Sequence, residues 1–205
     1  MEANKMKVRV TLIEDMLGTL PADPEIYRDF IASKAPDAMT REEETGVFGE
    51  EPVAEKGITV FARDKEGNPF IYDYLIKGFF KNACSAMRDV TGSASSKVKA
   101  YKKKIDNLVF VSPRMIKLPI AADDLGICER PLRASTAQGE RVALASSEVV
   151  PAGTQFEFEV ESLTKDMIEL VCEWLDYGKY NGLGCWHNSG KGRFSWENIT
   201  EKDNK

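Results

Sequence analysis

The chain has 205 residues, of which 42% are hydrophobic and 30% are charged, and its formal net charge is -5. These values are typical of a soluble globular protein that buries its own core, and the negative charge excludes attraction of nucleic acid by the field of the whole molecule. The sequence shows no signal peptide and no apolar run of transmembrane length. We therefore expect a cytoplasmic protein, of a bacterial host or an infected cell, without membrane contact.

The N-terminal third predicts a strand, a helix, an exposed segment and a hairpin. Residues 6–14 alternate between apolar and polar side chains, as a half-buried strand does. Residues 24–35 predict a short helix, and the acidic, aperiodic residues 36–55 predict a solvated surface segment. Residues 57–74 carry two β-rich runs around the turn sequence DKEGN, which predicts a hairpin.

The middle of the chain predicts a long helix and a basic segment. Apolar residues recur with helical spacing over residues 75–90, where Gly78 falls in the first turn. Residues 96–104 carry five lysines, the strongest local basic patch of this acidic chain. Such a run is most often the solvated face of a helix, and binding of an anion is the alternative. Two strands are predicted next, over residues 107–112 and 114–120.

The C-terminal part predicts a pair of strands, a helix and a last strand. The predicted elements are an irregular polar connection over residues 121–139, strands over 140–148 and 154–162, a helix over 163–178 and a strand over 194–199. Ser162 is the expected N-cap of the helix and Gly178 its expected C′ residue.

The order of these elements predicts one α+β domain. It corresponds to the βαββαβ order of a ferredoxin-like (RRM-like) core with inserted hairpins. We expect a single domain over residues 1–205, with residues 18–70 as an insertion. Because many functions use this fold, the function has to be argued from particular residues.

A glycine-rich stretch lies between the last predicted helix and the last predicted strand. Residues 182–196 read GLGCWHNSGKGRFSW. A Rossmann fingerprint follows a strand and opens a helix, which is the reverse of this context. A Walker loop needs Ser or Thr after its lysine, whereas Gly192 follows Lys191 here. Both nucleotide-binding interpretations are therefore poor.

The glycine spacing resembles the loop of the RAMP superfamily, the ferredoxin-like RNA-binding proteins of CRISPR effector complexes. That loop has the form GhGxxxxxGxG, and residues 182–192 fit every fixed position, with Leu183 as the h. A weaker similarity is the "KG…R" helix opening of RAMP backbone proteins, matched by Lys77, Gly78 and Arg88. The pattern is also similar to phage and prophage proteins. The resemblance implies a stand-alone RNA-binding member that engages, imitates or interferes with CRISPR effector subunits.

The chemistry of the loop is suited to single-stranded RNA. Glycine lets backbone N–H groups approach a phosphate closely, and flat side chains such as Trp186 can stack on a base. The resemblance adds arginines of the central connection as RNA contacts. The alternative is that the loop is simply a tight, structurally required connection. The predicted RNA-contacting residues are Lys77, Gly78, Lys97, Lys99, Lys102, Arg130, Arg133, Gly182, Gly184, Trp186, His187, Gly190, Lys191, Gly192 and Arg193.

Two further functions are compatible with the sequence. His187, the only histidine, is the candidate general acid–base of a RAMP-type endoribonuclease, although no Ser, Lys or Tyr partner is evident. The acidic charge favours a structural or interaction protein that binds no RNA. No metal-ligand spacing occurs, so we expect neither a metal nor a cofactor. The expected partners are single-stranded RNA, CRISPR effector subunits and further copies of the chain.

Overall fold

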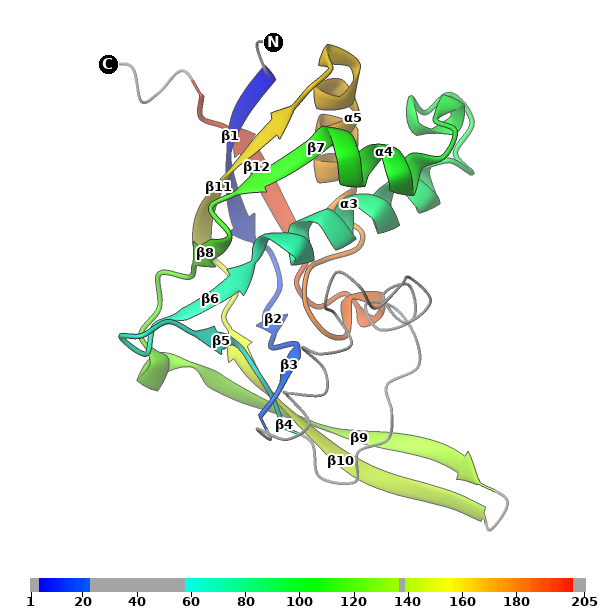
Figure 1. Cartoon of the computed structure of the whole chain (residues 1–205). Helices are drawn as coiled ribbons and strands as arrows, with labels where there is room; N and C mark the ends of the chain where they lie inside the picture. The colour runs from blue at the N-terminus through cyan, green and yellow to red at the C-terminus, as the bar shows by residue number, and fades with distance from the viewer. Residues whose placement is uncertain (1–3, 23–57, 137–138, 201–205) are drawn as a thin grey trace.

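A four-stranded antiparallel sheet forms the centre of the fold (Figure 1). The structure is a computed structural model that describes residues 4–22, 58–136 and 139–200. The strand order is β12-β1-β11-β7, so that the first strand of the chain lies in the interior of the sheet. These strands are β1 (Asn4–Leu12), β7 (Val109–Ser112), β11 (Gln155–Ser162) and β12 (Phe194–Asn198).

Two long helices connect the central strands. Helix α3 (Asp73–Met87) precedes β7, and α5 (Lys165–Tyr177) lies between β11 and β12. Along the chain the core therefore reads strand, helix, strand, strand, helix, strand, which confirms the predicted ferredoxin-like α+β core.

Both helices cover the same face of the sheet, where the hydrophobic core lies (Figure 1). Val8 and Val10 of β1 point into this core and are 0% exposed, as the alternation of the sequence predicted. Phe80 of α3 and Trp174 of α5 close the core from the helix side, with their ring centroids 5.7 Å apart. Each of these side chains contributes about 1.5–3 kcal/mol through burial.

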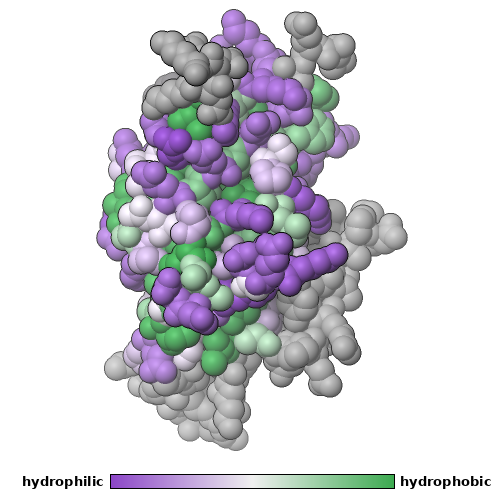
Figure 2. Space-filling view, turned by 90° about the vertical axis from the view of Figure 1, so that its left-hand side faces the viewer, coloured by the Kyte–Doolittle hydropathy of each residue, from purple (hydrophilic) through white to green (hydrophobic). Residues whose placement is uncertain are grey.

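The opposite face of the sheet is open and carries paired charges. Arg9 of β1 bridges Glu157 of β11 and Glu197 of β12, at 2.7 Å and 3.0 Å. Lys5 pairs with Glu161 at 3.0 Å two rows further along, beyond the row of Lys7 and Glu159. Figure 2 views the molecule from this side and shows mainly hydrophilic residues, with apolar patches between them. The open face therefore presents balanced ion pairs.

The remaining strands form two smaller sheets. One has the order β2-β10-β4-β3 with β9 beside β10, and the other has the order β5-β6-β8. Their strands are β2 (Met16–Leu17), β3 (Leu20–Pro21), β4 (Ile58–Val60), β5 (Ala62–Arg63), β6 (Pro69–Tyr72), β8 (Met115–Lys117), β9 (Gly126–Thr136) and β10 (Gly139–Val150). The long β9–β10 hairpin extends away from the core (Figure 1).

The irregular connection predicted over residues 121–139 is wrong for most of its length. After the short 3₁₀ helix η2 (Ala122–Asp124), β9 pairs with β10 from Gly126 to Thr136. This strand shows no alternation because it is held by its hairpin partner and not by the core. Ile127, for example, is 59% exposed. Backbone pairing thus forms a strand that the pattern of its side chains does not predict.

The hairpin predicted over residues 57–74 is only partly correct. Its first run splits at Phe61: β4 pairs with β3 and β10, and only β5 pairs with β6. The predicted turn is present, with Gly67 at φ +87° and Asp64 Oδ1 accepting the Asn68 N–H at 2.8 Å. The second run ends early because α3 begins at Asp73. The predictions over residues 24–35 and 36–55 lie outside the described residues.

Local details of the helices also differ from the predictions. The basic segment is not one helix: it divides into η1 (Ser95–Lys97) and α4 (Tyr101–Leu108), with Ala100 at φ +50° between them. Thr164, not Ser162, is the N-cap of α5.

Within the described ranges, no helix combines the length and apolar character needed to cross a bilayer.

Gly178 and Gly78 also sit differently from the predictions. Gly178 has a right-handed backbone at the end of α5, and its missing Cβ makes room for the Phe194 ring. Gly78 is buried in the second turn of α3 and not in the first.

Candidate nucleic-acid interface

The glycine-rich loop joins α5 to β12, and its first and last glycines bring two stretches of its backbone into close contact. An added Cβ on Gly182 would lie 2.1 Å from the carbonyl carbon of Gly192. An added Cβ on Gly192, which has φ +67°, would lie 1.8 Å from the Leu183 oxygen. The Leu183 N–H donates to the Gly192 oxygen at 3.0 Å in the same contact. The close approach of the two backbones therefore requires both glycines.

The other two glycines of the pattern are required by different constraints. Gly184 has φ +83°, and its backbone lies against β2, so that an added Cβ would meet the Leu17 oxygen at 2.4 Å. Gly190 has φ +88° and follows the 3₁₀ helix η3 (His187–Ser189). Of the residues that the structure describes, only Arg193 lies near its missing Cβ, with Nε at an ordinary 3.5 Å. At Gly182, Gly184 and Gly192, backbone atoms occupy the place where a Cβ would stand. Gly190 is the most open of the four positions.

The two cations of the loop bind carboxylates that follow β1. Lys191 Nζ lies 2.9 Å from Asp15 Oδ2, and this hydrogen bond lowers the pKa of Asp15 below its usual 3.8 and raises the pKa of Lys191. Arg193 Nη2 donates to Glu14 Oε1 at 3.1 Å, and its Nε donates to the Gly190 oxygen at 3.1 Å. Both side chains therefore hold the loop against the segment after β1.

The structure brings Arg130 of β9 to the same loop. Its Cζ lies 3.8 Å from the centroid of the Trp186 ring, a cation–π contact, and its Nη1 donates to Ser147 Oγ at 3.2 Å. Arg130 is only 3% exposed. His187 is half-buried, and its Nδ1 lies 3.0 Å from the Gly184 oxygen, which places a proton on Nδ1 because a carbonyl only accepts.

The predicted lysines lie apart from the loop. Lys97, Lys99 and Lys102 are exposed on η1, α4 and the turn between them. In Figure 1, α4 lies above α3, whereas the orange segment of the glycine-rich loop runs below it. The predicted residues therefore form two groups. The loop group consists of Arg130 and the predicted residues from Gly182 to Arg193, and the lysine group consists of Lys97, Lys99 and Lys102.

Three predicted residues belong to neither group. Lys77 is half-buried, its Nζ donates to the Asp106 oxygen at 3.2 Å, and burial lowers its pKa. Gly78 is buried beside it in α3. The side chain of Arg133 lies outside the described part of the molecule.

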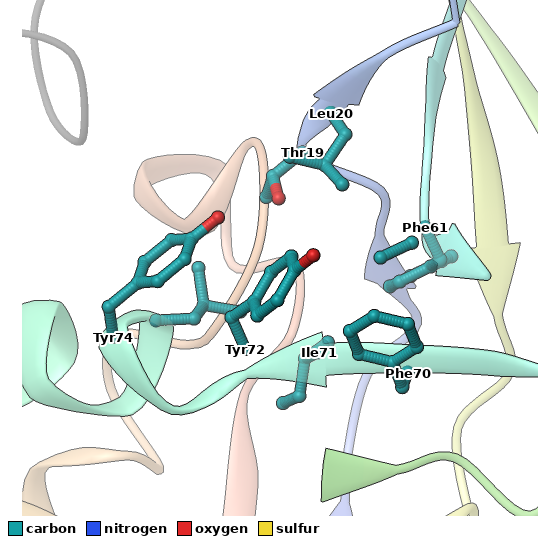
Figure 3. A pocket seen from close by; sticks show the side chains of 9 residues that line it. Thr19, Leu20, Phe61, Phe70, Ile71, Tyr72 and Tyr74 are labelled. Carbon is teal, nitrogen blue, oxygen red and sulfur yellow. The ribbon is translucent and has the colours of Figure 1, made fainter. Parts of the chain in front are cut away.

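A separate hollow lies where β3, β5 and β6 meet the start of α3. Figure 3 shows the nearly parallel rings of Tyr72 and Tyr74 there, with centroids 5.1 Å apart, together with Thr19 and Phe61. None of the predicted site residues lines it. Among the described residues, no group of three or more His, Cys, Asp or Glu side chains could hold a metal ion.

Sequence reasoning missed Glu14, Asp15 and Tyr180. The two carboxylates neutralise the loop cations, but they stand 176 and more positions away in the chain, and only their place just after β1 gives a signal. Tyr180, in the turn before Gly182, is 69% exposed. Its signal is an aromatic residue within a polar turn beside the glycine pattern.

Comparison with known proteins gives a likeness in fold. No protein-family model and no curated protein sequence matches the chain. A chain from the cryo-EM structure of the type III-B Cmr-β bound to cognate target RNA matches with TM-score 0.52 and 14% identity, over 96% of this chain and 59% of that one. This chain thus spans about three fifths of the length of that neighbour.

A chain of a type IV-B CRISPR complex matches over more of its own length. The TM-score is 0.52 and the identity 11%, over 97% of this chain and 91% of that one. At such low identity the likeness concerns the fold. The chain shares its overall fold with these two chains, and its central sheet has the ferredoxin-like strand order.

Proposed function

We propose that the chain is an RNA-binding RAMP-type subunit that binds single-stranded RNA and contacts subunits of a CRISPR complex. One observation carries the proposal: the GhGxxxxxGxG stretch lies between the last helix and the last strand of a ferredoxin-like core. This is the place that the RAMP resemblance requires. The likeness in fold to chains of a Cmr complex bound to target RNA and of a type IV-B CRISPR complex supports it.

The lysine group is the surface proposed for the phosphate backbone. Lys97, Lys99 and Lys102 are exposed, and Lys103 and Lys104 are exposed beside them. Such contacts release counterions from RNA, so affinity falls steeply with salt. A local cluster is needed because the whole chain carries a charge of -5.

The loop group is proposed to meet the RNA mainly through Gly190. This glycine has space at its missing Cβ, whereas the neighbouring cations already hold Glu14 and Asp15. A phosphate approaching the loop competes with these carboxylates for Lys191 and Arg193. The electrostatic attraction of the loop for a phosphate is therefore weaker than the two cations in its sequence suggest.

The finer assignment rests on the resemblance to phage and prophage proteins. It describes a stand-alone cytoplasmic member, one domain over residues 1–205 with residues 18–70 as an insertion, that associates with further copies. Such a protein imitates a CRISPR backbone subunit or interferes with its complex. A nuclease that uses His187 is the second reading, and it predicts metal-independent RNA cleavage that His187→Ala abolishes.

The test is RNA affinity of the purified protein at low and high salt. Fluorescence anisotropy with a labelled single-stranded RNA should show binding that weakens as salt rises, and Lys97→Glu/Lys99→Glu/Lys102→Glu should weaken it at least about tenfold. The control Lys65→Glu/Lys117→Glu/Lys165→Glu changes the net charge equally on exposed lysines elsewhere. Equal loss in both variants would reduce the effect to net charge, and no binding by the wild type would refute the function.

A further inference from the structure

The turn after α5 presents the most exposed large apolar side chain of the described residues. Tyr180 is 69% exposed, and the only other aromatic ring in the described part that is classed as exposed is Phe110, at 44%. The turn precedes Gly182 directly, so this ring stands at the entrance of the glycine-rich loop.

The backbone of the turn fixes where the Tyr180 ring projects. The N–H groups of Tyr180 and Asn181 both donate to the Tyr177 oxygen, at 2.9 Å and 3.2 Å. The Tyr177 ring lies behind that of Tyr180, with centroids 6.3 Å apart and planes inclined by 52°. A tyrosine side chain has only two χ angles, so it loses little conformational entropy when a planar ligand stacks on its ring.

A cation accompanies the exposed ring. Lys179 Nζ lies 5.0 Å from the centroid of the Tyr180 ring, and Lys179 is itself exposed. A flat apolar surface and a positive charge thus occur in two consecutive residues.

The aromatic group predicted from sequence is less suited to stacking. The Trp186 ring already carries the Arg130 guanidinium at 3.8 Å, and Arg130 is buried. A base could take that place only by displacing a buried charge from its hydrogen bond to Ser147. Over the Tyr180 ring lies the exposed Lys179, which a base can displace without uncovering a buried charge.

We propose that Tyr180 is the stacking platform for one nucleobase of single-stranded RNA and that Lys179 pairs with the adjoining phosphate. The inference rests on the proposed RNA-binding function and names a binding site within it. Stacking on a tyrosine tolerates any base, since every base has a π-face. The platform therefore supplies affinity without sequence preference.

The test uses a single-stranded RNA oligonucleotide carrying 2-aminopurine, whose fluorescence is quenched when it stacks. Tyr180→Ala should lower affinity by about five- to hundredfold and remove quenching at one position of the probe. Tyr180→Phe should keep both within about twofold, because it retains the ring. Leu163→Ala, at the other end of α5 and 37% exposed, is the control for loss of an exposed apolar side chain.

An abasic probe separates stacking from any effect on folding. Removing the quenched base should weaken wild-type binding as much as Tyr180→Ala does. The affinity of Tyr180→Ala for RNA should be the same with the abasic probe as with the complete probe. If the wild type binds RNA but Tyr180→Ala binds equally well, the platform is wrong and the function stands. If the wild type binds no RNA, the function fails and the platform fails with it.

Discussion

Replacement of Gly192 by alanine tests whether the glycine-rich loop is held by contact between backbones. The change imposes a side chain on a residue at φ +67°, which costs roughly 1–2 kcal/mol for an L-residue. It also places Cβ 1.8 Å from the Leu183 oxygen, where contacts of 3.4 Å or more are ordinary. The loop must open, and the Leu183–Gly192 hydrogen bond of 3.0 Å is lost, which costs about 0.5–1.5 kcal/mol more.

Gly153→Ala is the matched control for this change. Gly153 has φ +86°, but among the described residues no atom comes within 4 Å of its missing Cβ, so the backbone strain acts alone. Urea denaturation followed by circular dichroism should show a loss of about 1.5–3.5 kcal/mol for Gly192→Ala and roughly 1–2 kcal/mol for Gly153→Ala. Equal losses would mean that the loop tolerates a side chain at Gly192 and that the close approach does not matter for stability.

Three other outcomes follow from contacts around the loop and the lysine group. Arg130→Ala should lower the free energy of unfolding by about 1–3 kcal/mol in urea denaturation, because it uncovers Trp186, and an unchanged value would contradict the stacked geometry. Folding lowers the pKa of Asp15 below 3.8, so the wild type should be more stable than Asp15→Asn at neutral pH and should lose this advantage as the pH falls through the lowered pKa. Thermal melts from pH 7 to pH 2 measure the difference. An advantage that persists at the lowest pH argues against the ion pair. Glu173→Ala leaves the Ser95 and Ala94 N–H groups without their acceptor, so it should cost about 1–3 kcal/mol and weaken RNA binding by loosening η1, whereas unchanged hydrogen exchange in η1 would count against it.

The sequence predicts elements well where one face of a segment is buried. Residues 6–14 and 154–162 alternate because one side of each strand meets the core, and both strands are present. β9 was not predicted because backbone hydrogen bonds pair it with β10, and this pairing needs no particular pattern of side chains. The same holds for β4, which pairs with β3 and a parallel β10 across sequence distances that no local pattern reveals.

The candidate site was predictable in its residue types and not in its electrostatics. The glycine spacing predicted RNA contacts with a tight connection as the alternative, and the structure shows close backbone approach and positive φ at these glycines, while the RNA contacts stay a prediction. The partners of Lys191 and Arg193 could not be predicted, because Glu14 and Asp15 reach them only when β12 pairs with β1. The balance of charge at the loop is therefore a product of the tertiary fold.

The interior position of β1 bears on how the chain is made. Its neighbours in the sheet run from Gln155 to Ser162 and from Phe194 to Asn198, so one edge of β1 stays unpaired until residue 162 has been synthesised and the other until residue 198. Contacts between such distant segments slow folding, because a large loop has to close before any of them forms. A nascent or truncated chain that ends before β11 exposes β1 on both edges, and this strand is then the place where aggregation would begin.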